Sequence, residues 1–151
     1  MDKYDIKTPF GVVHVSAEDD AIVGLGWGST GRMDKTPVLV EAAQQINAYC
    51  VGTLTAFDLP MELSGRDLQR AVCAKMRAIP FGETRTYGEI AKDLALSAQT
   101  IGQACGRNPI PILIPCHRVM GAKGLTGFSG AGGVETKLAL LKHEGAGGFL
   151  I

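Results

Sequence analysis

Hydrophobic and polar positions alternate over the first part of the chain, between residues 4 and 27. The β-branched run Gly11–Val15 follows Thr8-Pro9, and a second apolar run, Ala21–Trp27, follows the polar turn Glu18-Asp19-Asp20. Short apolar runs bounded by turn residues are typical of β-strands, and two such runs in succession predict a hairpin. His14, inside the first run, is expected to be a structural or surface histidine rather than a ligand.

The hydrophobic period then changes to that of a helix. Thr36-Pro37 places an N-cap before a proline at the first helical position, and Gly52 can end the helix. The residues expected on its buried face are Val38, Ala42, Ile46 and Tyr49. Leu54–Leu63 is expected to supply another short strand.

A second module is predicted from Ser64 onward, which divides the chain into domains at 1–63 and 64–151. Ser64-Gly65-Arg66-Asp67 resembles a capping box, and a helix should follow it up to Pro80. The apolar stripe expected on this helix consists of Leu68, Val72, Met76 and Ile79.

Two short helices with a tight link come next and predict a helix-turn-helix. Thr86-Tyr87-Gly88-Glu89 is a capping-box pattern for the first, and Ser97 is the expected N-cap of the second, which runs to about Cys105. A last helix is predicted with Val134, Leu138 and Leu141 on its apolar face and Gly145 at its end.

The second of the paired helices carries small residues and no Lys or Arg before Arg107. Ala98, Thr100 and Gly102 would let the backbone approach a groove or a phosphate strand closely, whereas base readout usually uses Arg, Asn or Gln. Sequence-tolerant contact with DNA is one interpretation of this pattern, and helix packing through small residues is the other.

Charge is distributed unevenly, although the whole chain is neutral. Residues 1–62 hold four basic and nine acidic residues, a net −5, and residues 63–151 hold eleven basic and six acidic residues, a net +5. The second half would therefore suit a polyanion, unless the clustering is accidental. No secretory signal or membrane span is visible, so a cytoplasmic protein is expected.

The four cysteines have no metal-binding spacing, and neither a metal nor a cofactor is predicted. Cys116 stands out because it follows an apolar run and Pro115 and precedes His117. A thiol attacks as the thiolate, so it needs a base, and the base needs a third group such as Glu144 to hold it. Neighbouring residues of an extended segment point to opposite sides, so the pair requires a turn at Pro115-Cys116 or a bridging water. The alternative is that Cys116 is a small buried hydrophobe.

The string Asn108-Pro109-Ile110-Pro111-Ile112-Leu113-Ile114-Pro115-Cys116-His117-Arg118-Val119 closely resembles the active-site segment of the O6-alkylguanine-DNA alkyltransferases. Phe81-Gly82-Glu83, Thr86-Tyr87 and Leu140–Gly145 extend the resemblance. It implies an α+β protein in which a small sheet-and-helix, ribonuclease H-like domain precedes a helical domain with a winged helix-turn-helix-like DNA-binding motif.

By this resemblance, Cys116 accepts the alkyl group irreversibly from O6-alkylguanine after the nucleotide is flipped out of double-stranded DNA. His117 would take the thiol proton through a water, Glu144 would orient His117, Asn108 would brace the turn, and Tyr87 would donate toward the purine. The pocket would be lined by Val119, Gly127, Phe128 and Ser129, and the glycine-rich stretch 121–133 would form its wall. DNA would be bound through the minor groove by Ala98, Gln99, Thr100, Gly102, Arg107 and Arg118. A monomer is expected, associated with the nucleoid when bound to DNA.

The sequence departs from the family pattern at three positions. Gln99 stands where an arginine usually fills the gap left by the flipped base, Phe128 stands where many relatives have tyrosine, and Cys105 adds a second thiol that is expected to pack. Two other functions stay open. One is an alkyltransferase-like lesion binder, which characteristically lacks the acceptor cysteine, and the other is a cysteine hydrolase or redox protein.

Overall fold

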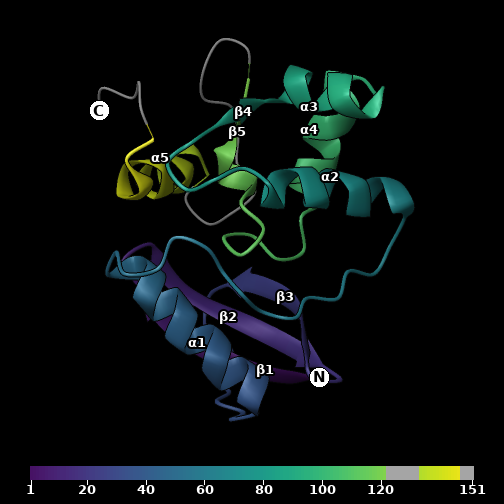
Figure 1. The fold of residues 1–151 in the computed structure, drawn as a ribbon. Helices are drawn as coiled ribbons and strands as arrows, with labels where there is room; N and C mark the ends of the chain where they lie inside the picture. Colours follow the sequence, from purple (N-terminus) through teal and green to yellow (C-terminus); the bar gives the residue numbers. More distant parts are fainter. Residues whose placement is uncertain (122–132, 147–151) are drawn as a thin grey trace. The chain divides into compact units, whose positions relative to one another are not determined.

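The computed structural model describes residues 1–121 and 133–146. These residues fall into two compact units: unit 1 ends at residue 64, and unit 2 holds the described residues from 65 onward. In unit 1, the strands β1 (Asp2–Thr8), β2 (Gly11–Glu18) and β3 (Ala21–Trp27) form an antiparallel sheet in chain order, and α1 (Pro37–Cys50) packs against it (Figure 1). Val13, Val15 and Ile22 supply the sheet's side of the core. The predicted strands between residues 4 and 27 are confirmed, as is their hairpin.

Helix α1 has the predicted start and face. Pro37 is its first residue, and Val38, Ala42, Ile46 and Tyr49 are all buried. Its apolar stripe covers the sheet because the residues repeat at the helical period.

The strand predicted at Leu54–Leu63 is wrong. Within the described residues, this segment makes one isolated bridge, Met61 to Ile22, held by Ile22 N donating to Pro60 O at 2.8 Å and Glu62 N donating to Ile22 O at 2.9 Å. Leu59 is nevertheless buried. One bridge anchors the segment to β3 without continuing the ladder.

Unit 2 consists mainly of helices: α2 (Asp67–Arg77), α3 (Tyr87–Leu94), α4 (Ala98–Gly106) and α5 (Val134–Glu144) (Figure 1). The short strands β4 (Arg85–Thr86) and β5 (Val119–Met120) pair in parallel, and the 3-10 turn η1 (Cys116–Arg118) precedes β5. Among the described residues, no helix combines the length and the apolar character that a membrane-spanning segment requires.

The paired helices α3 and α4 begin where the sequence predicts. Thr86 and Glu89 form a capping box, and the Ser97 side chain accepts from Thr100 N at 3.1 Å. Ala95, in the left-handed conformation with φ of 54°, ends α3 so that the chain can turn into α4.

Three details of the helices differ from the prediction. The Ser64–Asp67 capping box is wrong because the N-cap is Arg66, which makes no side-chain capping bond. Leu68 is 37% exposed and lies outside the core. On α5 the buried residues are Thr136, Lys137, Leu140, Leu141 and Glu144, so of the predicted apolar face only Leu141 is buried. This orientation follows from the polar residues Lys137 and Glu144, whose side chains hydrogen-bond to Val119 O and to His117 in the interior.

Candidate active site

The apolar run before Cys116 folds into a tight buried turn. Ile114 N donates to Ile110 O and Leu113 N to Pro111 O, both at 2.8 Å, and Ile112 adopts a φ of 71°. A positive φ is strained for a β-branched residue, so the surrounding contacts must hold it there.

Asn108 supplies those contacts from the end of α4. Its Nδ2 donates to Ile114 O at 2.7 Å, and its Oδ1 accepts from Ile110 N at 3.0 Å. The side chain is buried, so both bonds lie away from water. Asn108 thereby ties the two ends of the turn together and fixes where the chain delivers Cys116.

Cys116 is the first residue of η1 and is only 4% exposed. Burial raises the pKa of its thiol to about 11, although the Asn108 side chain and the Lys137 ammonium group act in the opposite direction. The resting group is therefore a thiol, and it requires a base before it can attack.

His117 is fully buried beside Glu144. Its Nε2 lies 2.7 Å from Glu144 Oε2, and burial lowers the pKa of His117 even though Glu144 acts to raise it. A carboxylate only accepts, so the neutral imidazole carries its proton on Nε2 and has its lone pair on Nδ1. Within the described residues Nδ1 has no hydrogen-bond partner. It is the atom of His117 that can accept a proton.

Arg118 completes this network from the same turn. Its Nε donates to Glu144 Oε1 at 2.8 Å and its Nη2 donates to Glu144 Oε2 at 3.0 Å. Its Nη1 donates to Ile79 O at 2.7 Å. The paired contacts are the fork geometry in which a guanidinium holds a carboxylate most firmly. Glu144 is thus fixed by Arg118 and in turn orients His117.

Lys137 brings a second buried cation to the site. Its Nζ donates to Val119 O at 2.6 Å and lies 5.8 Å from the centre of the Tyr87 ring. Burial lowers the pKa of this lysine, and the thiols of Cys116 and Cys105 act to raise it. Its charge favours the Cys116 thiolate over the thiol.

The parallel pairing of β4 with β5 places Tyr87 beside this turn. Arg85 pairs with Val119 and Thr86 with Met120, so Tyr87, the first residue of α3, follows directly after a strand that is bonded to the Cys116 segment. Lys137 then links the two strands' ends by contacting both Tyr87 and Val119.

Together these contacts describe a buried thiol nucleophile with a neutral imidazole, a carboxylate that orients it and a nearby ammonium group. Such a set suits covalent transfer to sulfur. Among the described residues there is no group of three or more His, Cys, Asp or Glu side chains that could hold a metal ion.

Comparison with known proteins gives family matches in both units of the chain. Residues 67–146 match the family described as 6-O-methylguanine DNA methyltransferase, DNA binding domain, and residues 3–63 match its ribonuclease-like domain. The chain belongs to the 6-O-methylguanine DNA methyltransferase family. The predicted membership and α+β fold class are confirmed.

Named relatives of this methyltransferase family agree. The methylated-DNA–protein-cysteine methyltransferase of Mycolicibacterium paratuberculosis is 38% identical over 92% of this chain and 89% of its own length. That of Mycobacterium bovis is 49% identical over 68% of this chain and 63% of its own length. The structure of Mycobacterium tuberculosis OGT in complex with DNA has a TM-score of 0.86, 37% identity and coverage of 97% of this chain and 94% of that one.

The structure brings the residues expected for methyltransferase chemistry close together. Asn108 and Lys137 both act on the pKa of Cys116, Glu144 contacts His117, and Lys137 joins Val119 to Tyr87. The turn expected at Pro115-Cys116 is present as η1. In a 3-10 turn, consecutive side chains diverge by roughly 120°, so the thiol and the imidazole point in different directions and the turn favours a bridged proton transfer over a direct one.

Arg118 was predicted to contact DNA, and that prediction is wrong. It is 6% exposed and its guanidinium is committed to Glu144 and Ile79 O. A buried arginine whose three nitrogens each donate to a group inside the protein is not placed to reach a phosphate. The residues predicted on α4 differ: Ala98 and Gln99 are exposed, Thr100 and Gly102 are half-buried, and Arg107 at its C-cap is exposed.

The remaining predicted pocket residues, Gly127, Phe128 and Ser129, lie outside the described residues, as does most of the glycine-rich stretch. Cys105 packs as expected: its thiol donates to Met76 Sδ at 3.6 Å, and burial raises its pKa to about 12. It is therefore a poorer nucleophile than Cys116 and belongs to the core.

Lys137 was missed by sequence reasoning. It lies beside the apolar face predicted for α5, but a lysine is not expected to be buried there, and its partners lie in β5 and α3. A lysine three residues before the paired leucines Leu140-Leu141 was the only local signal, because it shares their helical face.

Proposed function

We propose that this chain repairs O6-alkylguanine in DNA by transferring the alkyl group to Cys116 once and irreversibly. The observation that carries the proposal is the buried Cys116 thiol, followed in its own turn by a neutral His117 that Glu144 and Arg118 hold in place. Membership of the methyltransferase family gives this arrangement its reaction.

The transfer begins with the thiol proton. His117 Nδ1 accepts it through a bridging water, and Glu144 stabilises the imidazolium that forms. The Cys116 sulfur then attacks the alkyl carbon, the S–C bond forms as the C–O6 bond breaks, and the electron pair leaves with guanine. A thioether does not release the alkyl group again, so each molecule reacts once.

The departing guanine carries negative charge until it is protonated. Tyr87 donates a hydrogen bond toward the purine, and the proton taken from the thiol balances the charge of the released base. Lys137 stabilises the thiolate before attack because its ammonium group interacts electrostatically with Cys116. Thiolate formation and stabilisation of the leaving group are the two requirements for a poor leaving group.

The DNA partner follows from the family and from likeness to a protein solved in complex with DNA. We place α4 in the minor groove, where exposed Ala98 and the open side of Gly102 allow close approach and Gln99 occupies the stack left by the flipped nucleotide. Flipping costs a few kcal/mol, which the binding contacts must offset. The protein acts as a monomer in the cytoplasm and joins the nucleoid when bound to DNA.

Intact-protein mass spectrometry tests this function. Wild-type protein is mixed with a duplex containing O6-methylguanine, in parallel with Cys116→Ser. The expected result is a mass gain of one CH2 group on the wild type alone, at one methyl group per protein. Duplex binding without any mass gain would contradict alkyl transfer and assign the chain to lesion sensing.

A further inference from the structure

A groove separate from the Cys116 site lies between the start of α2 and one face of α4. It has a volume of about 590 Å³ and its walls include Arg66, Leu68, Gln69, Thr100, Gln103 and Arg107. The interactions described above for Cys116, His117 and Glu144 involve none of these side chains. The described site therefore leaves this groove without a role.

The two walls of the groove are held at a fixed separation. Gln69 Nε2, from α2, donates to Ala104 O of α4 at 2.8 Å, and the backbone nitrogen of Arg107 donates to the same carbonyl at 3.1 Å. This bond crosses between helices 35 positions apart in the chain. Arg66 and Arg107 are thus presented by a braced pair of helix ends.

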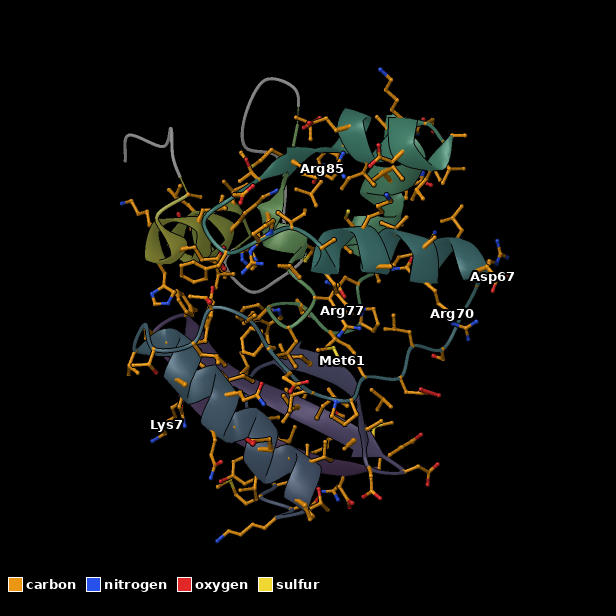
Figure 2. The ribbon with its side chains drawn as sticks, in the orientation of Figure 1. Lys7, Met61, Asp67, Arg70, Arg77 and Arg85 are labelled. Carbon is orange, nitrogen blue, oxygen red and sulfur yellow. The ribbon has the colours of Figure 1, made fainter. Side chains whose placement is uncertain are left out.

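The arginines of unit 2 divide into two groups. Arg70, Arg85 and Arg118 pair with Asp67, Asp93 and Glu144 at 3.4, 2.9 and 2.8 Å. Figure 2 shows Arg70 beside Asp67 at the first turn of α2. Over residues 65–121 and 133–146, the arginines that form no ion pair are Arg66, Arg77 and Arg107, and two of these three line the groove. None of the described residues that line it is acidic.

Two exposed guanidinium groups across one groove, with amide and hydroxyl donors between them, form a site for an oxyanion. Gln103 and Thr100 supply those donors from the same face of α4. By the 3.6-residue period, Gln103 lies roughly 40° around the helix from Gln99, which in turn lies between Gln103 and the small residues Ala98 and Gly102. A duplex whose minor groove meets the small-residue face would therefore bring one strand's backbone alongside the groove.

We propose that the groove binds a backbone phosphate of duplex DNA, held between Arg66 and Arg107. This rests on the proposed function, because it takes α4 as the helix that meets the DNA. The site adds affinity that is independent of sequence, since phosphate contacts position a protein on DNA without reading bases.

The test compares charge-removing and charge-keeping variants in the full chain. Arg66→Gln and Arg107→Gln should each weaken binding to an unmodified duplex roughly three- to tenfold at low salt, and each should reduce the slope of log affinity against log salt by about one. Arg66→Lys and Arg107→Lys keep the charge and should retain most of that slope, which a merely structural role would not predict. Thermal unfolding of each variant reports whether it folds.

Arg77→Gln is the matched control. Arg77 is exposed at the far end of α2, as Figure 2 shows. Its replacement by glutamine removes the same charge as the groove variants do, but outside the groove. Equal loss of affinity in Arg77→Gln and the groove variants would overturn the proposal, because net charge alone would explain it. Unchanged affinity in folded Arg66→Gln and Arg107→Gln would overturn it too.

The wild type separates this proposal from the function itself. Its reaction with the free base O6-methylguanine, followed by mass, reports the acceptor site without DNA. Transfer to Cys116 together with groove variants that bind as the wild type does would overturn the phosphate site alone. A wild type that neither accepts a methyl group nor binds the duplex would overturn both.

Discussion

Arg118 and Glu144 form a buried ion pair in which two nitrogens of the guanidinium donate to the two carboxylate oxygens at 2.8 and 3.0 Å. They come from neighbouring elements, η1 and α5, and the pair fixes the carboxylate that contacts His117. The turn bearing the acceptor is thereby tied to the last described helix. Arg118 therefore acts structurally, by holding Glu144 against His117.

Replacing Arg118 by methionine should lower the free energy of unfolding by about 3–5 kcal/mol, because it leaves Glu144 buried without its partner. The measurement is urea denaturation. Arg70→Met is the control: its pair with Asp67 is exposed, so it should cost no more than about 1 kcal/mol. If Arg118→Met left stability unchanged and instead lowered the salt slope of DNA binding, Arg118 would be a DNA contact after all.

Lys137→Met should slow methyl transfer more than it changes stability. The variant loses the charge that lowers the pKa of Cys116, so the thiolate becomes harder to form, and we expect a rate loss on the order of tenfold. Losing the bond to Val119 O is offset by removing a buried charge, so the free energy of unfolding should change by less than about 2 kcal/mol.

Single-turnover rates with a methylated duplex, together with urea denaturation, test this separation. Lys142→Met, exposed on the same helix, should leave the rate unchanged. A stability loss in Lys137→Met large enough to account for the slower transfer would show that the lysine acts only in the core.

Asn108→Ala should destabilise unit 2 by about 2–4 kcal/mol, because it leaves Ile110 N and Ile114 O buried without their bonds and releases the strained Ile112. Asn47→Ala, at an exposed position of α1, is the control and should change stability by less than about 0.5 kcal/mol. Equal effects in urea denaturation would mean that Asn108 does not brace the turn.

The elements whose signals are local were predicted from the sequence. Thr86 and Ser97 begin α3 and α4 because a capping side chain acts within one turn, and Gly145 ends α5 for the same reason. The contact between Glu144 and His117 could also be predicted, because the family resemblance implies it.

What could not be predicted depends on contacts between distant segments. The buried face of α5 follows from Lys137 and Glu144, whose partners lie 18 and 26–27 positions earlier in the chain. Arg118 resembles a DNA contact in sequence, because nothing near it in the chain indicates its buried partner Glu144. The positive φ of Ile112 has no signal at all, since no glycine or asparagine marks it.

The rate of transfer should be nearly independent of pH between about 7 and 9. The reactive pair is a thiol with a neutral imidazole, and burial keeps both groups in that form: it holds the pKa of Cys116 at about 11 and that of His117 below its ordinary value. The rate should fall only below about pH 6.5, the ordinary pKa of histidine, as His117 becomes protonated.

Single-turnover rates across this pH range check the prediction, with His117→Gln as the comparison. Without the base, only thiolate already present can react, so the rate of the variant should rise about tenfold per pH unit as pH approaches the pKa of Cys116. A tenfold rise per unit in the wild type would contradict a role for His117 as base.

Gln99→Arg should increase the affinity for duplex DNA or the rate of transfer from it. Gln99 is exposed on the first turn of α4, and in the proposed complex it fills the gap left by the flipped nucleotide without contributing charge. Arginine there would stack as well and add attraction to the phosphates, so a gain of roughly threefold or more is expected at low salt.

The control is Gln44→Arg, at an exposed position of α1, which adds the same charge in unit 1 and should give no comparable gain. Both variants are compared with wild type in duplex binding and single-turnover transfer, with the free base O6-methylguanine as a substrate that needs no flipping. A variant that speeds transfer from the free base as much as from the duplex would place the effect outside nucleotide flipping. No gain in affinity or rate would show that glutamine serves this position as well as arginine does.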